Sequence, residues 1–211
     1  MRILLILLCF AQTLKVLGTN YYVRNGGNDS NDGLSDSNAW ASHPWMSTWR
    51  GSIWLKAGDT IFMKRGDSWI ISGTSVPFLT IDQSGTEGKN IVTTAYGTGE
   101  SPLIKISTAS DQSVIYGSGK SYLTFDNLHI QHHSSNYNSS CSGYEFANVC
   151  HHIVITNNEI DNCPAFGIHG SGNCYQIVIG DTTANQTATS SDYSNHIHDF
   201  GYAGVGLEGV N

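Results

Sequence analysis

The stretch HIVITNNEI (residues 152–160) repeats the pattern of YLTFDNLHI (residues 122–130), which lies 30 positions earlier. Both stretches place apolar residues at their second, fourth and ninth positions, with mostly polar residues between them. Alternation of apolar and polar residues is typical of a β-strand with one buried face. Each repeat is therefore predicted to hold two or three short strands, broken by Gly or Asn.

Two further copies follow along the chain. QIVIG (176–180) repeats the first part of the phrase after 24 residues, and after 37 residues Asn195 and Ile197 take the places of Asn158 and Ile160. Repeats of about 20 to 40 residues with variable insertions are typical of stacked repeat architectures. No helical 3.6-residue pattern fills the intervals, which excludes βαβ units and leucine-rich repeats. We therefore predict an all-β, single-stranded parallel β-helix with successive turns about 4.8 Å apart.

Shorter apolar runs precede these copies. NIVTTAY (90–96), PLIKI (102–106) and SVIYG (113–117) are predicted to be shorter turns of the same coil. The composition agrees with this, because the chain is rich in Gly, Ser, Asn, Thr and Asp and poor in Leu, Ala, Glu and Lys. Such a composition disfavours helices and suits short strands joined by turns.

The charge is negative and uneven. The 211 residues carry 17 acidic and 10 basic side chains, for a net charge of −7. No Lys or Arg follows Lys120, whereas eight of the nine His do. Nucleic acids and anionic membrane surfaces are bound largely through Lys and Arg, so the pattern argues against both as partners.

The first residues are typical of a secretory signal peptide. Arg2 is followed by the apolar run ILLILLCFA (3–11), which is too short to span a bilayer, and VLG (16–18) ends in a small residue. We predict that residues 1–19 are a signal peptide. The mature protein is expected to be secreted or to lie at the cell surface or in the periplasm, without a membrane partner.

The segment after the signal peptide differs from the repeats. We assign residues 20–75 to an N-terminal cap with the first strands, and residues 76–211 to the β-helix coils. All five Trp lie between residues 40 and 69, and the spacing of Trp45 and Trp49 predicts a short helix in this cap. The end of a β-helix exposes strand edges and core, so we expect the Trp side chains to cover it rather than to stack on sugars.

Two segments of this N-terminal part resemble a known family. YYVRNGGNDSNDGLSDSNAW (21–40) and LKAGDTIFMKRGDSW (55–69) are similar to the opening of secreted right-handed parallel β-helix proteins of the pectate-lyase-like superfamily. The resemblance covers nearly all of the mature chain and implies a right-handed coil. That superfamily includes polysaccharide lyases, glycoside hydrolases and non-catalytic surface proteins. The resemblance therefore implies an extracellular polysaccharide as the partner, and calcium as the cofactor of a lyase.

The last residues, GLEGVN (206–211), stop just inside a new turn. Four or five coils are also few for a protein of this kind. We therefore expect the sequence to be a fragment, truncated at its C-terminus, with further coils downstream. The folded protein is expected to be a monomer.

Stacking of the repeats predicts which side chains share the outer surface. If Ile130, Ile160 and Ile197 point inward in one stack, their neighbours point outward. The predicted outer columns are, in chain order, His129, Glu159 and His196, then Gln131, Asp161 and His198. With the adjacent Asp199, they give the candidate catalytic residues His129, Glu159, Asp161, His196, His198 and Asp199. Imidazoles beside carboxylates suit proton transfer or metal binding, although a solvated polar face accounts for the same pattern.

Three function classes remain open. A lyase must remove a proton beside a carboxylate, and the resemblance implies a Lys or Arg base, which the coils after Lys120 lack. The base is then a His or Tyr, lies on coils further downstream, or is Lys105 or Lys120. A glycoside hydrolase needs two carboxylates, for which Asp161 and Asp199 are candidates. A non-catalytic, glycan-binding or adhesive rod is the third class.

The remaining polar positions are given structural roles. Asn157, Asn158 and Asn195 are predicted to shape corners, and Gly167 and Gly204 to occupy tight turns. The histidines that border loops are expected at the surface: His132, His133, His151 and His152. Four cysteines follow the signal peptide, and both disulfides and buried free thiols are compatible with their positions: Cys141, Cys150, Cys163 and Cys174. Their spacing does not form a zinc motif, and the sequence does not identify a metal.

Overall fold

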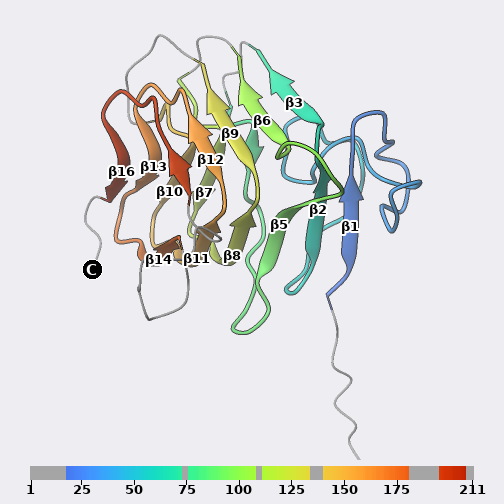
Figure 1. Ribbon diagram of the computed structural model, residues 1–211. Coiled ribbons are helices and arrows are strands. Elements are labelled where there is room, and N and C mark those ends of the chain that lie inside the picture. Colours follow the sequence, from blue (N-terminus) through green and yellow to red (C-terminus); the bar gives the residue numbers. More distant parts are fainter. Residues whose placement is uncertain (1–17, 73–75, 108–110, 134–139, 181–194, 208–211) are drawn as a thin grey trace, which may run out of the picture.

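Each turn of the chain contributes one strand to each of three parallel sheets, which we call A, B and C (Figure 1). The computed structural model describes residues 18–72, 76–107, 111–133, 140–180 and 195–207. From β2 (Thr60–Lys64) onward, the chain visits sheet A, then C, then B, and returns to A. The pairings between neighbouring strands of a sheet are parallel, so the predicted parallel β-helix is confirmed.

The strands are short, as the sequence predicts. Sheet A contains β1 (Asn20–Val23), β2 (Thr60–Lys64), β5 (Ile91–Tyr96), β8 (Ser121–Asp126), β11 (His151–Thr156) and β14 (Tyr175–Ile179). Sheet B contains β4 (Leu79–Thr80), β7 (Ile115–Ser118), β10 (Tyr144–Ala147), β13 (Phe166–Gly170) and β16 (Ala203–Leu207). Sheet C contains β3 (Ser68–Ile71), β6 (Leu103–Ile106), β9 (His129–His132), β12 (Glu159–Asp161) and β15 (His196–Ile197).

The predicted register is confirmed at the positions that set the core. Ile160 pairs with Ile130 on one side and with Ile197 on the other. Ile130 and Ile160 are fully buried, and Ile197 packs partly buried against the same core. One expectation needs correction: the runs at 90–96, 102–106 and 113–117 are not separate turns. They form β5, β6 and β7, the three strands of a single coil.

Asparagines shape the corner between sheets A and C. Asn127 and Asn157 both have positive φ, of 57° and 54°, which Asn tolerates better than most residues. Asn158 is buried and bonds the neighbouring coils instead of its own backbone. Its Oδ1 accepts the Leu128 N–H at 2.9 Å, and its Nδ2 donates to the Phe125 carbonyl at 3.0 Å. The role at the corners that was predicted for Asn157 and Asn158 is therefore confirmed.

The predicted cap helix at Trp45–Trp49 is wrong, because no helix occurs in the part of the chain that the structure describes. Residues 43–49 form consecutive turns. Backbone groups that a helix would need are bonded elsewhere: Ser47 N–H donates to the Phe78 carbonyl at 2.9 Å, and Thr80 N–H donates to the Trp45 carbonyl at 2.8 Å. Pairing with the first strand of sheet B thus prevents the helix.

The Trp side chains nevertheless cover the first coil, as expected. Trp40, Trp45 and Trp69 are buried, and Trp49 packs against them with its ring centroid 5.0 Å from that of Trp40. Trp54 is the exception, with 67% of its surface exposed. The buried rings close the end of the core where strand stacking begins.

Gly167 and Gly204 were predicted to occupy tight turns, and the structure corrects this. Gly167 lies inside β13 and Gly204 inside β16, and neither has a positive φ. Gly167 is required for a different reason. A Cβ atom at this position would lie 2.5 Å from the Ile197 side chain and 2.7 Å from the Gly204 carbonyl oxygen.

We expect Gly167→Ala to lower the free energy of unfolding by about 1–3 kcal/mol, because the added methyl group meets backbone that cannot move aside. Gly117→Ala is the matched control on β7. There the added Cβ lies 3.0 Å from the flexible end of Ile81, so the expected loss is smaller. Urea unfolding measures both, and equal losses in the two variants would contradict the close-packing role of Gly167.

The four cysteines are buried, and none forms a disulfide. The alternative of buried thiols is therefore the one that the structure contains. Burial raises the pKa of the Cys163 thiol to about 12, which keeps it protonated and unreactive. Among the described residues, no helix is long and apolar enough to cross a membrane. Residues 1–17 of the predicted signal peptide lie outside the described residues.

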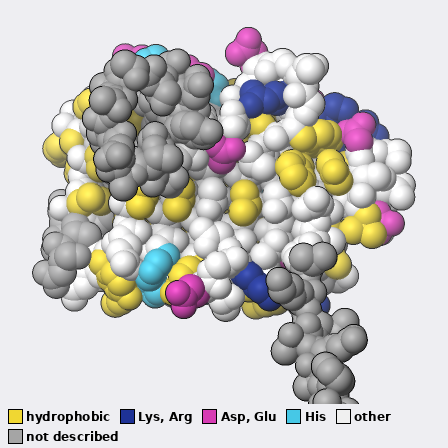
Figure 2. Space-filling model, turned by 60° about the horizontal axis from the view of Figure 1, so that its bottom comes forward, with side chains coloured by type: hydrophobic (Ala, Val, Ile, Leu, Met, Phe, Trp, Pro, Cys, Tyr) yellow, Lys and Arg dark blue, Asp and Glu magenta, His cyan; other side chains and the backbone are white. Residues whose placement is uncertain are grey.

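Basic side chains are confined to the first coils. Figure 2 looks onto the side of the molecule that carries sheet A and shows Lys and Arg only toward the N-terminal coils, on the right. This agrees with the lack of Lys and Arg after Lys120. The later coils therefore rely on His, Asp and Glu for any charged chemistry.

Candidate functional site

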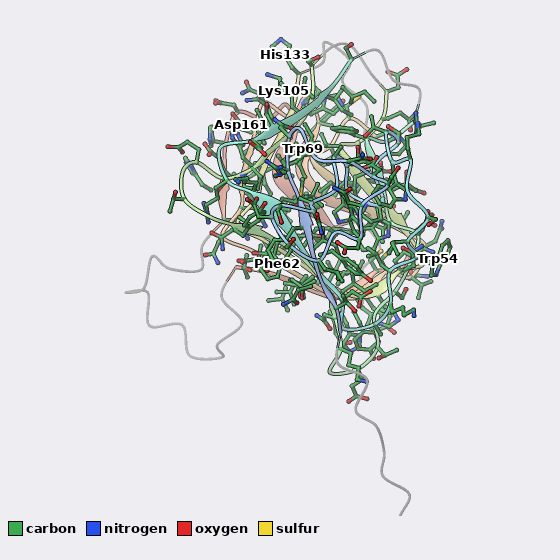
Figure 3. All side chains as sticks on the ribbon, turned by 90° about the vertical axis from the view of Figure 1, so that its right-hand side faces the viewer. Trp54, Phe62, Trp69, Lys105, His133 and Asp161 are labelled. Carbon is green, nitrogen blue, oxygen red and sulfur yellow. The ribbon has the colours of Figure 1, made fainter. Side chains whose placement is uncertain are left out.

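The candidate catalytic residues predicted from the sequence lie together on the outer face of sheet C. Glu159 on β12 pairs with His129 on β9 and with His196 on β15, so the first predicted column is confirmed. Asp161 pairs with Gln131, and the His198 N–H donates to the Ile160 carbonyl at 3.1 Å, which places His198 beside them. Figure 3 shows Asp161 and Lys105 on this same face, on the opposite side of the molecule from Trp54.

Asp161 is the most strongly held carboxylate of this face. It accepts a hydrogen bond from His129 Nε2 at 3.0 Å, and two from Gln131 Nε2 at 3.2 and 3.1 Å. Asn162 Nδ2 adds a further one at 2.8 Å. Only 10% of the Asp161 side chain is exposed. With its oxygens occupied in this way, Asp161 is suited to orient His129 rather than to react itself.

His129 is held in one tautomer by this contact. Since Nε2 faces the carboxylate of Asp161 it carries the proton, and the lone pair is then on Nδ1. Nδ1 lies 3.7 Å from Glu159 Oε2, beyond hydrogen-bond distance, and about a fifth of the side chain is exposed. An oriented imidazole with a free lone pair can act as a general base.

Lys105 lies in the same row of sheet C as Gln131 and Asp161, one coil before Gln131 and two coils before Asp161. It pairs with Gln131 across β6 and β9, and its side chain makes no hydrogen bond or ion pair with another described residue. In the sequence this lysine is only one of several alternatives for the base, because it lies on an early coil near the cap. The register places its ammonium group on the same outer face as His129 and Asp161.

A second cluster lies on the C-terminal side of the same face. Glu159, His196 and His198 each offer one ligand atom, and these atoms lie within 4.8 Å of one another. Asp199 accepts a hydrogen bond from His198 Nδ1 at 2.8 Å. This contact raises the pKa of His198 above its ordinary value. The six nominated residues therefore gather on one face, in two neighbouring clusters.

The donors of this cluster do not suit calcium. Ca²⁺ takes six to eight oxygen ligands, whereas the described residues here offer one carboxylate and two imidazoles. The expectation of calcium, which came from the resemblance, therefore has no matching ligand set at this position.

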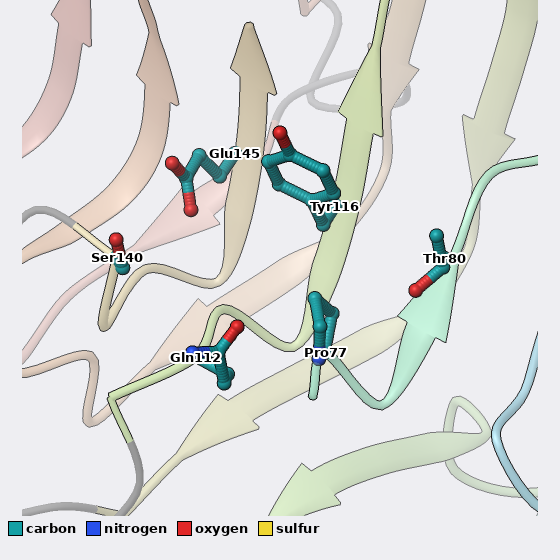
Figure 4. Close-up of a pocket in the computed structure, with 6 residues that line it drawn as sticks. All are labelled: Pro77, Thr80, Gln112, Tyr116, Ser140 and Glu145. Carbon is teal, nitrogen blue, oxygen red and sulfur yellow. The ribbon is translucent and has the colours of Figure 1, made fainter. Parts of the chain in front are cut away.

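A pocket on sheet B was missed by the sequence analysis (Figure 4). It has a volume of about 390 Å³ and is lined by Pro77, Thr80, Gln112, Tyr116, Ser140 and Glu145. Tyr116 and Glu145 are neighbours because β7 pairs with β10, and Ser113 Oγ lies 2.7 Å from Glu145 Oε2. Aligning SVIYG (113–117) with SGYEF (142–146) would have placed the two side chains together.

Three histidines that the sequence predicts at the surface lie outside both the outer face of sheet C and the pocket on sheet B. His132 is buried, which corrects the prediction: it takes an inward position of β9, next to Ile130, and its Nε2 contacts the Gln112 carbonyl at 2.8 Å. Burial lowers its pKa. His151 and His152 lie on sheet A, where they stack on Tyr175 and Tyr122.

Comparison with solved structures supports the fold. A scan of protein-family models and a search of curated proteins give no match. Among solved structures, the GH136 lacto-N-biosidase from Eubacterium ramulus aligns with a TM-score of 0.53 and 18% identity, over 76% of this chain and 34% of that one. The pectate lyase Pel9A aligns with a TM-score of 0.52 and 17% identity, over 88% of this chain and 60% of that one.

The chain has the parallel β-helix fold of these enzymes. It spans about a third of the length of the lacto-N-biosidase and three fifths of that of the pectate lyase. At such low identity the similarity concerns the fold alone, and the resemblance seen in the sequence is confirmed at that level.

Proposed function

We propose that this β-helix protein is secreted and cleaves an acidic extracellular polysaccharide by β-elimination on the outer face of sheet C. The observation that carries the proposal is the His129–Asp161 pair, with Nε2 and Oδ1 3.0 Å apart, on the same outer face as Lys105, which lies two coils before Asp161 in the same row. A base and a cation on one open face are the two groups that elimination from a uronic acid requires.

His129 supplies the base. Its Nδ1 lone pair takes the proton from the carbon beside the sugar carboxylate, while Asp161 stabilises the imidazolium that forms. The electrons of the broken C–H bond form the new carbon–carbon double bond. The bond to the glycosidic oxygen breaks, and this oxygen leaves with a proton from solvent.

Lys105 supplies the positive charge. The sugar carboxylate gains negative charge as the proton is removed, and an ammonium group beside it stabilises that charge. Glu159 and Asp161 make the face acidic, so a substrate anion binds where Lys105 and Gln131 lie, at the edge nearer to the N-terminal coils. The polymer then runs across the strands of sheet C toward His129.

The test is a set of glycan incubations with the full chain. We expect pectin or alginate, but not neutral glycans, to give products that absorb in the unsaturated-uronide band. His129→Gln is expected to lower the initial rate by about 100-fold or more, because loss of a general base typically has effects of this size. Lys105→Ala is expected to lower kcat and to raise KM, because Lys105 both binds the substrate carboxylate and stabilises the charge that this carboxylate gains.

His151→Gln is the matched control, since it replaces a histidine on sheet A, away from this face. It should leave the rate unchanged. The lyase proposal fails if no acidic glycan yields the absorbing product with or without added Ca²⁺, or if His129→Gln retains the full rate with an unchanged circular dichroism spectrum.

The pocket on sheet B favours a second candidate function. An aromatic ring beside amide, hydroxyl and carboxylate groups is a common sugar-binding arrangement, and Tyr116, Gln112 and Glu145 provide it. This site would bind a glycan without elimination, or hydrolyse it with Glu145 as one of two carboxylates. New reducing ends without uronide absorbance would indicate hydrolysis. Retention on a glycan column that is lost in Tyr116→Ala, without cleavage, would indicate binding alone.

A further inference from the structure

We propose that Glu159, His196 and His198 form a binding site for a divalent first-row transition-metal ion. The three side chains come from two adjacent coils: Glu159 lies on β12, His196 pairs with it on β15, and His198 follows two residues later. Their ligand atoms lie within 4.8 Å of one another. Two imidazoles and a carboxylate are a ligand set that zinc and iron(II) proteins use.

The backbone brings the ligands to one point. His196 N–H donates to the Asn158 carbonyl at 2.8 Å, and His198 N–H donates to the Ile160 carbonyl at 3.1 Å. These bonds fix β15 and the residue after it against β12. His198 Nε2 already lies 3.6 Å from Glu159 Oε1, and two donors that share a tetrahedral zinc ion are about 3.4 Å apart.

His198 carries the most direct sign of a missing ligand. Its Nε2 atom is buried and has no hydrogen-bond partner. Its other nitrogen, Nδ1, donates to Asp199 Oδ2 at 2.8 Å. This bond places the lone pair on Nε2, facing Glu159, which is the arrangement that metal-bound histidines have when a carboxylate orients them. A metal ion would satisfy this buried nitrogen.

The site is open on one side. Glu159 and His198 are partly exposed and His196 is exposed, so solvent or a ligand oxygen can complete the coordination of a bound ion. The imidazole nitrogens select against Ca²⁺ and Mg²⁺, which prefer oxygen. The proposal concerns binding alone and does not depend on the lyase function proposed above.

Metal titration of the chelator-treated full chain tests the site. We expect one equivalent of Zn²⁺ by calorimetry, and visible absorption typical of nitrogen and oxygen ligands when Co²⁺ is added. Millimolar Ca²⁺ should not displace Co²⁺. His198→Gln and the double variant Glu159→Gln/His196→Gln should weaken Zn²⁺ binding by more than about 100-fold. Asp199→Asn should weaken it by about 10- to 100-fold, because Asp199 acts through His198.

The matched control is the double variant His151→Gln/His152→Gln. These two histidines lie on sheet A with their Nδ1 atoms 2.6 Å apart, so they are the neighbouring pair that could bind zinc adventitiously. Unchanged binding in this variant supports the proposal. Loss of binding here, full binding in Glu159→Gln/His196→Gln, or displacement of Co²⁺ by Ca²⁺ would overturn it. Circular dichroism checks that each variant is folded.

Discussion

Replacing Asn158 by Ala is expected to lower the free energy of unfolding by about 2–5 kcal/mol. The Asn158 side chain is almost completely buried at the corner between sheets A and C. Its removal leaves the Leu128 N–H and the Phe125 carbonyl without their partner. A buried backbone group that loses its hydrogen bond typically costs about 1–3 kcal/mol, and water cannot enter this corner without opening it.

Asn195 provides the comparison, because it takes the same place one coil later. Its Oδ1 accepts the Asn158 N–H at 3.0 Å and its Nδ2 donates to the Ile155 carbonyl at 2.7 Å. It is only partly buried, so water can replace part of what Asn195→Ala removes, and we expect a loss of about 1 kcal/mol. Chemical denaturation measures both variants. A loss below 1 kcal/mol in Asn158→Ala would mean that this asparagine does not hold the coils together.

Much of the fold could be predicted from the sequence, because a β-helix converts spacing along the chain into vertical stacks. The 30- and 37-residue offsets gave the register of Ile130, Ile160 and Ile197. The cap could not be predicted in the same way. Trp45 and Trp49 have helical spacing, but backbone pairing with residues 78–80 is a long-range contact that local spacing does not contain.

The sequence predicted where the candidate site lies, but not the hydrogen bonds between its side chains. The stacking of the repeats identified the outer column of sheet C, whereas the hydrogen bonds that separate its roles depend on side-chain rotamers. Asp161 orients His129, and Asp199 orients His198, although all four residues look alike as members of a polar face. Lys105 and Lys120 were left as alternatives for the base, because both lie on early coils near the cap.

Lowering the pH is expected to destabilise the protein through His43, at the N-terminal end of the core. His43 is fully buried; its Nδ1 accepts the Trp45 N–H at 3.0 Å and its Nε2 lies 3.2 Å from Thr93 Oγ1. Burial lowers its pKa from an ordinary value of 6.5 to about 3. The folded protein therefore keeps this imidazole neutral over a pH range in which the unfolded chain binds a proton.

Proton linkage gives the direction and the size of this change in the free energy of unfolding. Between pH 6.5 and pH 3 the unfolded chain holds one proton more at His43 than the folded protein, so the free energy of unfolding falls as the pH falls. The loss is about 1.4 kcal/mol per pH unit, or about 3 kcal/mol at pH 4.

The variant His43→Gln tests this expectation, because it keeps a hydrogen-bonding side chain but cannot titrate. Urea unfolding between pH 7 and pH 4 should show a slope lower by about one proton in this variant, whereas the two proteins should have parallel slopes between pH 7 and pH 9. Equal slopes below pH 6 would show that His43 becomes protonated in the folded protein, against the burial that the structure gives it.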